Sequence, residues 1–307
     1  MKNPTVSVII PTYNRAHLVG RAIQSVLNQT YQDFELIIVD DGSTDNTKEV
    51  IKEFQEQNKR VKYIKHDKNK GGSAARNTGI KTARGKYIAF QDSDCEWLPE
   101  KLGKQIKIFK RASPEIGVVY TGSKVIKNNK KFYAPSSKIK KKEGNIYKAL
   151  LEGNFISTGT AAVVTEYLKK VGMFDERLPR FQDWELWIRL SKYYRFKFIN
   201  EPLYINYRQT AGNISNDQNA LIVAQKLILE KHLGEFKEQG KKFLSKKYFS
   251  LGNLLCQNGE MSRGREYILK AIRIYSFSIK YFCALFFSMF NSKIYNRLLR
   301  IRRIIFF

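Results

Sequence analysis

Two clusters of acidic residues stand where chemistry could occur, because each directly follows an apolar run. Asp40 and Asp41 come after FELIIV, and Asp92 and Asp94 come after KYIAFQ. A buried strand that ends in carboxylates places negative charge at the edge of a sheet, where open α/β folds bind their ligands. Two carboxylates one residue apart can hold Mg²⁺ or Mn²⁺ between a protein and a diphosphate. The acids therefore predict a metal and anion site in a chain that is otherwise strongly basic.

Each cluster also has an interpretation that requires no ligand. The acids at 40 and 41 can cap the next helix, although Ser43 and Thr44 offer capping oxygens of their own. A D-x-D sequence by itself is common in exposed turns. Because the second cluster follows a strand, and a strand upstream also ends in acids, we favour the metal site for Asp92 and Asp94.

The elements that would position these acids alternate along the first 122 residues. This alternation implies βαβ units, an α/β fold class and a mostly parallel sheet with helices on both faces. The apolar patterns predict strands at 6–10, 34–39, 61–65, 87–90 and 118–120, and helices at 18–28, from 43–45 to about 57, at 74–83 and at 99–110. Pro11 is expected to end the first strand.

The rhythm changes after residue 122. A run with eight lysines at 124–142 predicts a hairpin or loop, and 196–207 predicts a strand pair or one bent strand. Helices are expected at 145–152, from 166 and at 183–194, with a strand at 160–164. From about residue 217 the pattern is entirely helical, and 251–274 predicts a helical hairpin with its turn at Asn258 and Gly259.

Composition limits the class of protein. The chain has 307 residues, 43% of them hydrophobic and 13% aromatic, which suits a packed core. Its formal charge of +27 favours anionic partners. The three cysteines are far apart, which predicts reduced thiols in a cytoplasmic protein. The N-terminus is not typical of a signal peptide, and no apolar run is long enough to predict a spanning helix.

Five motifs in order resemble the inverting family 2 glycosyltransferases of the GT-A fold. They are VSVIIPTYNR, VDDGSTD, GGSAARNTGI, FQDSDCEW and QDWELWIRL, and the resemblance covers residues 6 to about 215. It implies a GT-A (Rossmann-like) catalytic domain at 1–215, followed by a helical region at 216–307. It also implies a nucleotide-diphosphate sugar donor, with a UDP-sugar as the first expectation, and Mg²⁺ or Mn²⁺ as cofactor.

The resemblance assigns the donor-binding residues. Pro11 and Tyr13 would line the nucleotide base, and Arg15 would lie near its phosphates. Asp41 would accept a hydrogen bond from the imide N–H of uracil. Arg76, which follows the glycines at 71–72, would also lie near the donor, where a helix N-terminus attracts phosphate. Without the other motifs, PTYNR would be an ordinary turn between a strand and a helix.

The resemblance also assigns the metal ligands and the catalytic general base. Asp94 would be the direct metal ligand, and Asp92 would contact the ribose, or the metal through water. Asp183 would be the general base that takes the proton from the acceptor hydroxyl. It is usually preceded by Glu in the family, but here by Gln182. Arg208, with NIS at 213–215, would lie near the diphosphate, and no histidine there supplies a third metal contact.

Some of these residues have structural alternatives. Asp183 could be a helix N-cap, because Asp is favoured at that position. Trp184 and Trp187 are assigned to the core by default and not to a sugar platform. His17, His66 and His232 receive no specific role.

The C-terminal region mixes cations with aromatic and aliphatic residues. Residues 267–307 contain eight Lys and Arg residues and no Asp or Glu. This composition favours an anionic membrane surface over a soluble helical bundle. Nucleic acid is not expected as a partner, because no recognition motif is present.

The sequence therefore predicts a metal-dependent inverting glycosyltransferase acting on a glycan or lipid-linked acceptor. It would be cytoplasmic and peripheral at the cytoplasmic face of a membrane. Two alternatives stay open at this point. A sugar-nucleotide nucleotidyltransferase would carry a glycine-rich basic loop after the first strand, where PTYNR stands. A non-catalytic sugar-nucleotide or nucleic-acid binding protein would not need all three acidic positions.

Overall fold

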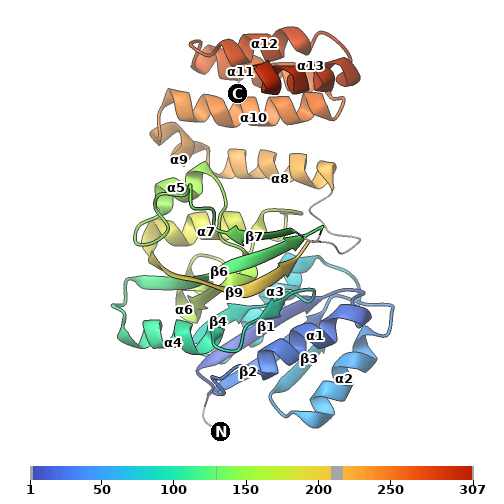
Figure 1. Ribbon diagram of the computed structural model, residues 1–307, viewed down its shortest axis with the longest axis vertical. Helices are drawn as coiled ribbons and strands as arrows, with labels where there is room; N and C mark the ends of the chain where they lie inside the picture. The colour runs from blue at the N-terminus through green and yellow to red at the C-terminus, as the bar shows by residue number, and fades with distance from the viewer. Residues whose placement is uncertain (1–2, 129, 209–216, 306–307) are drawn as a thin grey trace. The chain divides into compact units, whose positions relative to one another are not determined.

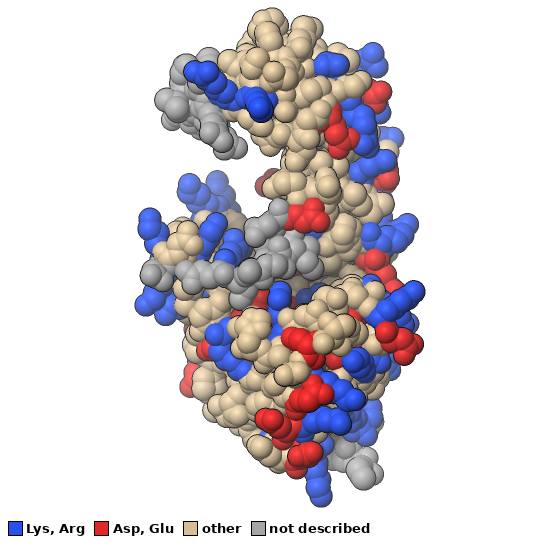
Figure 2. All heavy atoms as spheres, turned by 90° about the vertical axis from the view of Figure 1, so that its right-hand side faces the viewer, with Lys and Arg blue, Asp and Glu red and all other residues tan. Residues whose placement is uncertain are grey.

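The computed structural model describes residues 3–128, 130–208 and 217–305, with side chains up to residue 298 (Figure 1). The chain divides into two compact units, Met1–Arg177 with Phe181–Gly212, and Leu178–Arg180 with Asn213–Phe307. The predicted domain boundary between residues 215 and 216 lies outside the described residues and stays a prediction. Lys and Arg are spread over the visible face of both units, with fewer acids between them (Figure 2).

The first unit is built on one sheet with the strand order β3-β2-β1-β4-β8-β6-β9-β5, and β7 pairs with β6. β1 is parallel to β2 and β4, β8 is antiparallel to both β4 and β6, and β9 is parallel to β6. The carboxyl ends of β1, β2, β4, β6 and β9 therefore lie at one edge. The strands are β1 Val6–Thr12, β2 Phe34–Asp40, β3 Val61–Lys65, β4 Tyr87–Phe90, β5 Glu96–Trp97, β6 Ile116–Lys127, β7 Lys130–Ala134, β8 Ala161–Val164 and β9 Arg195–Tyr207.

Helices cover both faces of this sheet, and the predicted α/β class is confirmed. Side chains of α1, α2 and α4 pack on one face in a core cluster with Val8 and Ile10. On the other face α3 lies so close to β1 that a Cβ on Gly79 would meet Ile9 Cγ2 at 2.6 Å. The helices are α1 Ala16–Leu27, α2 Thr47–Gln57, α3 Gly72–Thr82, α4 Lys101–Arg111, α5 Tyr147–Glu152, α6 Thr165–Lys170, α7 Gln182–Tyr193 and the short 3₁₀ turn η1 Thr158–Thr160.

Pro11 does not end the first strand, contrary to the expectation. β1 continues to Thr12, and Pro11 pairs in register with Val39. The carbonyl of Ile9 accepts from Gln91 N on the β4 side, so Pro11, two residues later, also faces that side. β4 ends at Phe90, so the missing N–H of proline breaks no ladder there. The bent strand expected at 196–207 is β9, whose register with β6 shifts at Gly122.

The second unit is helical, as predicted. Its helices are α8 Gln218–Lys231, α9 Leu233–Glu238, α10 Lys241–Gln257, α11 Met261–Ile274, α12 Ile279–Phe287 and α13 Ser292–Ile305. The predicted turn between α10 and α11 is present, with Gly259 at φ +92°. A Cβ on Gly252 would meet the carbonyl oxygen of Gly264 at 2.8 Å, so these two helices are in backbone contact. Among the described residues, no helix is both long and apolar enough to cross a membrane.

Candidate functional site

The loop after β1 is fastened to the loop after β2. Asn14 adopts a left-handed backbone with φ +50°, and its N–H donates to Ser43 Oγ at 2.9 Å. Its side-chain oxygen accepts from Thr44 N at 2.9 Å, and Arg15 N donates to Thr47 Oγ1 at 3.0 Å. Two sequence motifs are thus held side by side at the sheet edge. Pro11 and Arg15 are partly buried there, and Tyr13 is 41% exposed.

Asp41 is buried and anchors the glycine loop that precedes α3. Its Oδ1 accepts from Lys70 N at 2.9 Å and contacts His66 Nδ1 at 2.7 Å, and its Oδ2 accepts from Gly71 N at 2.7 Å. The other ring nitrogen of His66 lies 2.9 Å from Thr78 Oγ1. With Nδ1 donating and Nε2 accepting, the histidine links the carboxylate to α3. The structure therefore gives Asp41 a positioning task that the sequence did not indicate, and the base contact stays a prediction.

Asp92 has a donor on each carboxylate oxygen. Arg76 of α3 donates from Nη2 to Oδ1 at 2.9 Å, and Tyr204 of β9 donates from its hydroxyl to Oδ2 at 2.7 Å. The Arg76 guanidinium also lies 5.6 Å from the ring centre of Phe174. Asp92 is thus fixed between a helix on one face of the sheet and a strand from its far half. Arg76 therefore lies at the acidic cluster, and its expected position near the donor stays a prediction.

Asp94, like Asp92, is partly buried. Burial raises the pKa of the Asp94 carboxyl, and the negative charge of Asp92 raises it further, while Cys95 and the charge of Arg15 oppose these effects. The Cys95 thiol lies 3.2 Å from Asp94 Oδ1. Arg15 therefore acts on Asp94 electrostatically, which connects the loop after β1 with the acids after β4.

Arg21 of α1 holds the backbone of this acidic turn, a role that the sequence did not reveal. Its Nη2 donates to the carbonyl oxygen of Asp94 at 2.9 Å, and its Nε lies 3.0 Å from Glu96 Oε1. The guanidinium also stacks 4.3 Å above the ring of Tyr207, whose hydroxyl donates to Glu96 at 3.2 Å. α1, β5 and β9 thereby fix the position of Asp94.

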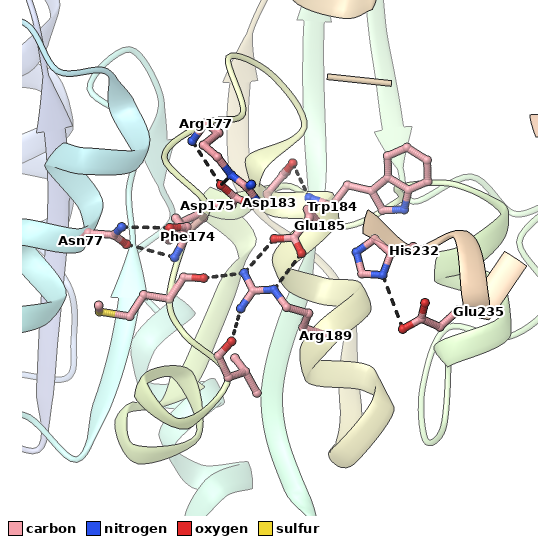
Figure 3. Close-up of polar contacts among 12 residues, drawn as sticks. Asn77, Phe174, Asp175, Arg177, Asp183, Trp184, Glu185, Arg189, His232 and Glu235 are labelled. Carbon is pink, nitrogen blue, oxygen red and sulfur yellow. Dashed lines mark hydrogen bonds and ion pairs between the residues drawn. The ribbon is translucent and has the colours of Figure 1, made fainter. Parts of the chain in front are cut away.

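Asp183 lies in the first turn of α7, where it was expected (Figure 3). Burial raises the pKa of its carboxyl. Hydrogen bonds from Trp184 N, at 2.7 Å, and from the Asn154 side chain lower it, as does the charge of Arg76, while Asp92 raises it. The arrangement differs from a plain N-cap, because Phe181 is the capping residue, with φ +61°.

A buried ion pair and an asparagine hold the segment that leads into α7 (Figure 3). Arg189 donates to both oxygens of fully buried Glu185, at 2.8 and 2.7 Å, and also to the carbonyl of Met173. Asn77 of α3 exchanges two hydrogen bonds with the backbone of Phe174, at 2.9 and 3.0 Å. These contacts fix the start of α7 relative to α3, and therefore Asp183 relative to the helix of Arg76.

Several buried side-chain atoms have no hydrogen-bond partner within the described residues, Gln91 Oε1 directly after β4 among them, and three lie at the end of β1 and in the first two turns of α3. They are Thr12 Oγ1 at the end of β1, Ser73 Oγ in the first turn of α3 and Arg76 Nε. Buried polar groups are nearly always hydrogen-bonded in folded proteins. The three atoms therefore fit a site that is completed by a polar ligand, and neither Thr12 nor Ser73 was singled out from the sequence.

The remaining residues that were singled out from the sequence make no described contact with the acidic cluster. Arg208 follows β9, its backbone N–H donates to Ile126 O at 2.9 Å, and its side chain is exposed. The NIS motif at 213–215 lies outside the described residues. Trp187 is fully buried and donates to Ile156 O at 3.0 Å, so it belongs to the core, while partly buried Trp184 donates to Leu150 O at 2.6 Å.

Asp92 and Asp94 fit a divalent cation that is shared with a diphosphate. Mg²⁺ is typically bound by one or two carboxylates, with phosphate and water oxygens in the other positions. The buried Asp94 carboxyl next to a second negative charge is the kind of group that a cation stabilises. Among the described residues no cluster of three or more metal-ligating side chains exists, so a cage made of protein alone is not formed there.

Comparisons with known proteins agree with this geometry. A family model described as glycosyl transferase family 2 matches residues 7–172. An uncharacterized glycosyltransferase of Methanocaldococcus jannaschii is 35% identical over 254 residues, 81% of this chain and 85% of that protein. The Escherichia coli UDP-Glc:alpha-D-GlcNAc-diphosphoundecaprenol beta-1,3-glucosyltransferase WfgD is 34% identical over 222 residues, 71% of this chain and 82% of that one.

Solved structures share the fold at low sequence identity. S. aureus TarS 1-349 in complex with UDP-GlcNAc has a TM-score of 0.71 at 20% identity, covering 88% of this chain and 81% of that chain. The mannosyltransferase PcManGT from Pyrobaculum calidifontis, in complex with GDP-Man and Mn²⁺, has a TM-score of 0.59 at 19% identity, covering 92% and 79%. At these identities the similarity supports the GT-A fold and not a particular substrate.

Proposed function

The chain belongs to glycosyl transferase family 2 and is therefore a glycosyltransferase, and we propose that it transfers a sugar from a UDP-sugar to an acceptor hydroxyl with inversion. One observation carries the proposal. Arg76 of α3 binds Asp92 at 2.9 Å, and Asp92 lies close enough to Asp94 and to Asp183, which is on a different element, to raise the pKa of both carboxyls. Three carboxylates and Arg76 therefore form one electrostatically coupled group at the edge where parallel strands end.

Asp183 is the general base in this proposal. The acceptor oxygen forms a bond to the anomeric carbon while the bond from that carbon to the diphosphate oxygen breaks, and the hydroxyl proton passes to Asp183. Burial raises the pKa of the Asp183 carboxyl and makes it a stronger base than an exposed aspartate. A single displacement of this kind inverts the anomeric centre.

The donor lies along the loops after β1 and β2 and the start of α3. Pro11 and Tyr13 contact the base, and Arg15 and Arg208 bind the phosphates, as the family resemblance implies. The hydroxyls of Thr12 and Ser73, which lack partners within the described residues, add hydrogen bonds to the donor.

Asp41 and Arg76 complete the donor contacts. Asp41 has three donors, and a carboxylate offers about four acceptor positions, so one remains for the uracil imide. The Nε of Arg76, which has no partner in the described part of the chain, is available to a phosphate oxygen.

Asp94 would be the direct ligand for Mg²⁺ or Mn²⁺, as the family resemblance implies, while Arg76 and Tyr204 hold the two oxygens of Asp92. Asp92 would then reach the metal through water, or contact the ribose. A bound divalent ion stabilises the negative charge that develops on the leaving diphosphate. Arg21 and Tyr204 keep the two carboxylates in place.

The proposed acceptor is a glycan or a lipid-linked sugar. The E. coli relative is named for transfer to a GlcNAc-diphosphoundecaprenol, and the present chain spans 82% of that protein. An acceptor of this kind would place the protein at the cytoplasmic face of a membrane, with the basic C-terminal helices against anionic lipid. Nucleic acid is not part of the proposal.

A thermal-shift titration tests the donor class. The full chain is mixed with UDP, GDP, dTDP or CMP, each with and without Mn²⁺. We expect stabilisation by UDP that depends on Mn²⁺ and is lost in Asp94→Asn. Stabilisation by UDP without any metal dependence would contradict the metal role. A shift with GDP alone would reassign the base specificity, and no shift with any nucleotide would contradict the donor site.

A further inference from the structure

α12 of the second unit turns large apolar side chains toward solvent. Six of them, on the helix and on its two flanks, are between 41% and 88% exposed: Phe277, Ile279, Phe282, Phe286, Met289 and Phe290. The positions 279, 282, 286 and 289 follow helical spacing, so they form one continuous stripe. Soluble monomers rarely expose apolar patches of this extent without a function.

The orientation of α12 is fixed by its opposite face. Tyr281, Ala284 and Ser288 are buried, and the Tyr281 hydroxyl lies 3.1 Å from Ser245 Oγ of α10. Arg265 of α11 donates to the carbonyl oxygen of Ser288 at 2.7 Å. Rotation of the helix would break these contacts, so the apolar stripe is a stable feature of the surface.

Positive charge accompanies the stripe. The 41 residues from 267 to 307 carry eight Lys and Arg residues and no acid. Arg273 at the end of α11, and Lys293 and Arg297 on α13, are exposed. Figure 2 shows a largely uncharged surface on the helical unit, with Lys and Arg and a few Asp and Glu at its margins. Aromatic and aliphatic groups with cations nearby complement an anionic lipid surface, whose interior is apolar and whose headgroups are negative.

We propose that the α12 stripe inserts into the interfacial layer of an anionic bilayer and that Lys293 and Arg297 bind its headgroups. α12 has nine residues, which is too short to span a bilayer, so the helix lies in the plane of the surface. This inference deepens the membrane location given under the proposed function. It does not depend on which sugar nucleotide is bound.

Flotation with vesicles of equimolar phosphatidylglycerol and phosphatidylcholine tests the surface. The first variant is the full chain with Phe282→Ser and Phe286→Ser combined. We expect it to bind vesicles at least about 30-fold more weakly than wild type, because it lacks the two phenyl rings that would be transferred from water into the bilayer. The matched control combines Phe132→Ser and Tyr193→Ser, two similarly exposed aromatics of the first unit, and should bind like wild type. Each of Lys293→Gln and Arg297→Gln should weaken binding about fivefold, and only to the anionic vesicles.

Three outcomes would overturn the inference. One is equal flotation of wild type and the Phe282/Phe286 variant. A second is equal loss in the control variant. The third is a stable dimer in solution, seen by light scattering, that the same two substitutions dissolve, since a second copy of the chain would then cover the stripe. Thermal shift with UDP and Mn²⁺ is measured on each variant. It distinguishes a loss of vesicle binding from a loss of the donor site.

Discussion

Replacing Asp41 with Asn should destabilise the glycine loop at residues 70–71. We expect this loss of loop contacts, and not a lost contact to the nucleotide base, to be the main effect. The buried carboxylate accepts hydrogen bonds from Lys70 N and Gly71 N and contacts His66. Asparagine has the same shape but presents one oxygen and one NH₂ group. If its oxygen keeps Lys70 and His66, its NH₂ faces the N–H of Gly71, and two donors meet without an acceptor.

The magnitude follows from these contacts. A buried donor that loses its acceptor costs about 1–3 kcal/mol, and a hydrogen bond to a charged group is worth about 1 kcal/mol more than a neutral one. One orphaned donor and two weakened bonds lower the free energy of unfolding by about 3–5 kcal/mol. The glycine loop would also lose its fixed position, so the affinity for UDP with Mn²⁺ should fall in parallel.

Urea unfolding and UDP binding measured on the same variant check this reasoning. Asp67→Asn is the control, because it removes the same charge from an exposed position in the same segment, and it should change neither quantity appreciably. The reasoning is refuted if Asp41→Asn unfolds like wild type and still loses UDP binding. The carboxylate would then serve the nucleotide and not the loop.

Three further substitutions give distinct expectations. Asp183→Asn should lower kcat by about 10²–10⁴-fold with unchanged UDP affinity. Because burial raises the pKa of the Asp183 carboxyl, the acidic limb of the wild-type kcat profile should lie above the ordinary aspartate range and vanish in the variant. Burial and the charge of Asp92 raise the pKa of Asp94, so ionisation opposes folding. In the absence of metal, Asp94→Asn should therefore be more stable than wild type at neutral pH in urea unfolding, and the difference should shrink as the pH falls through the raised pKa. Glu185→Gln leaves the Arg189 guanidinium without its buried carboxylate and should lower the free energy of unfolding by about 3–5 kcal/mol, measured in the same way.

The alternation of strands and helices could be predicted because each element has its own pattern of apolar residues within a short segment of sequence. Buried parallel strands appear as uninterrupted apolar runs, and the strands expected at 61–65 and 87–90 have the observed bounds. β5 was missed because it has only two residues and exists through its pairing with β9, more than 100 positions later. β6 is longer than expected, since its second half is stabilised by β7 and β9, which no local pattern reveals.

The acids of the site could be chosen from the sequence, but their partners could not. Asp92 follows a strand and was found by that position, whereas Tyr204, which binds it, lies 112 residues away. Arg21 reaches Asp94 across 73 positions, and His66 reaches Asp41 across 25. Such contacts depend on the order of strands in the sheet and on which face each helix covers.

The second unit shows the same limit for surfaces. The sequence indicated helices that mix cations with aromatic and aliphatic residues after residue 267, but it could not show whether an apolar face packs in a core or meets solvent. Only the contacts of Tyr281 and Ser288 show which side of α12 is covered. The sequence-based interpretation placed the emphasis on the cations near the C-terminus, whereas the described surface places the exposed apolar groups on α12.

The charge balance of the site leads to one more expectation. Asp92 raises the pKa of both Asp94 and Asp183, and the nearby cations that oppose this effect include Arg15 at Asp94 and Arg76 at Asp183. The net charge of +27 on the chain as a whole helps little, because exposed charges are screened beyond about 8 Å at physiological salt. A diphosphate adds negative charge to this group, and UMP, with one phosphate, adds less. The gain in affinity from Mn²⁺ should therefore be larger for UDP than for UMP in calorimetric titrations. Equal gains for both nucleotides would mean that the metal does not bridge these carboxylates to a diphosphate.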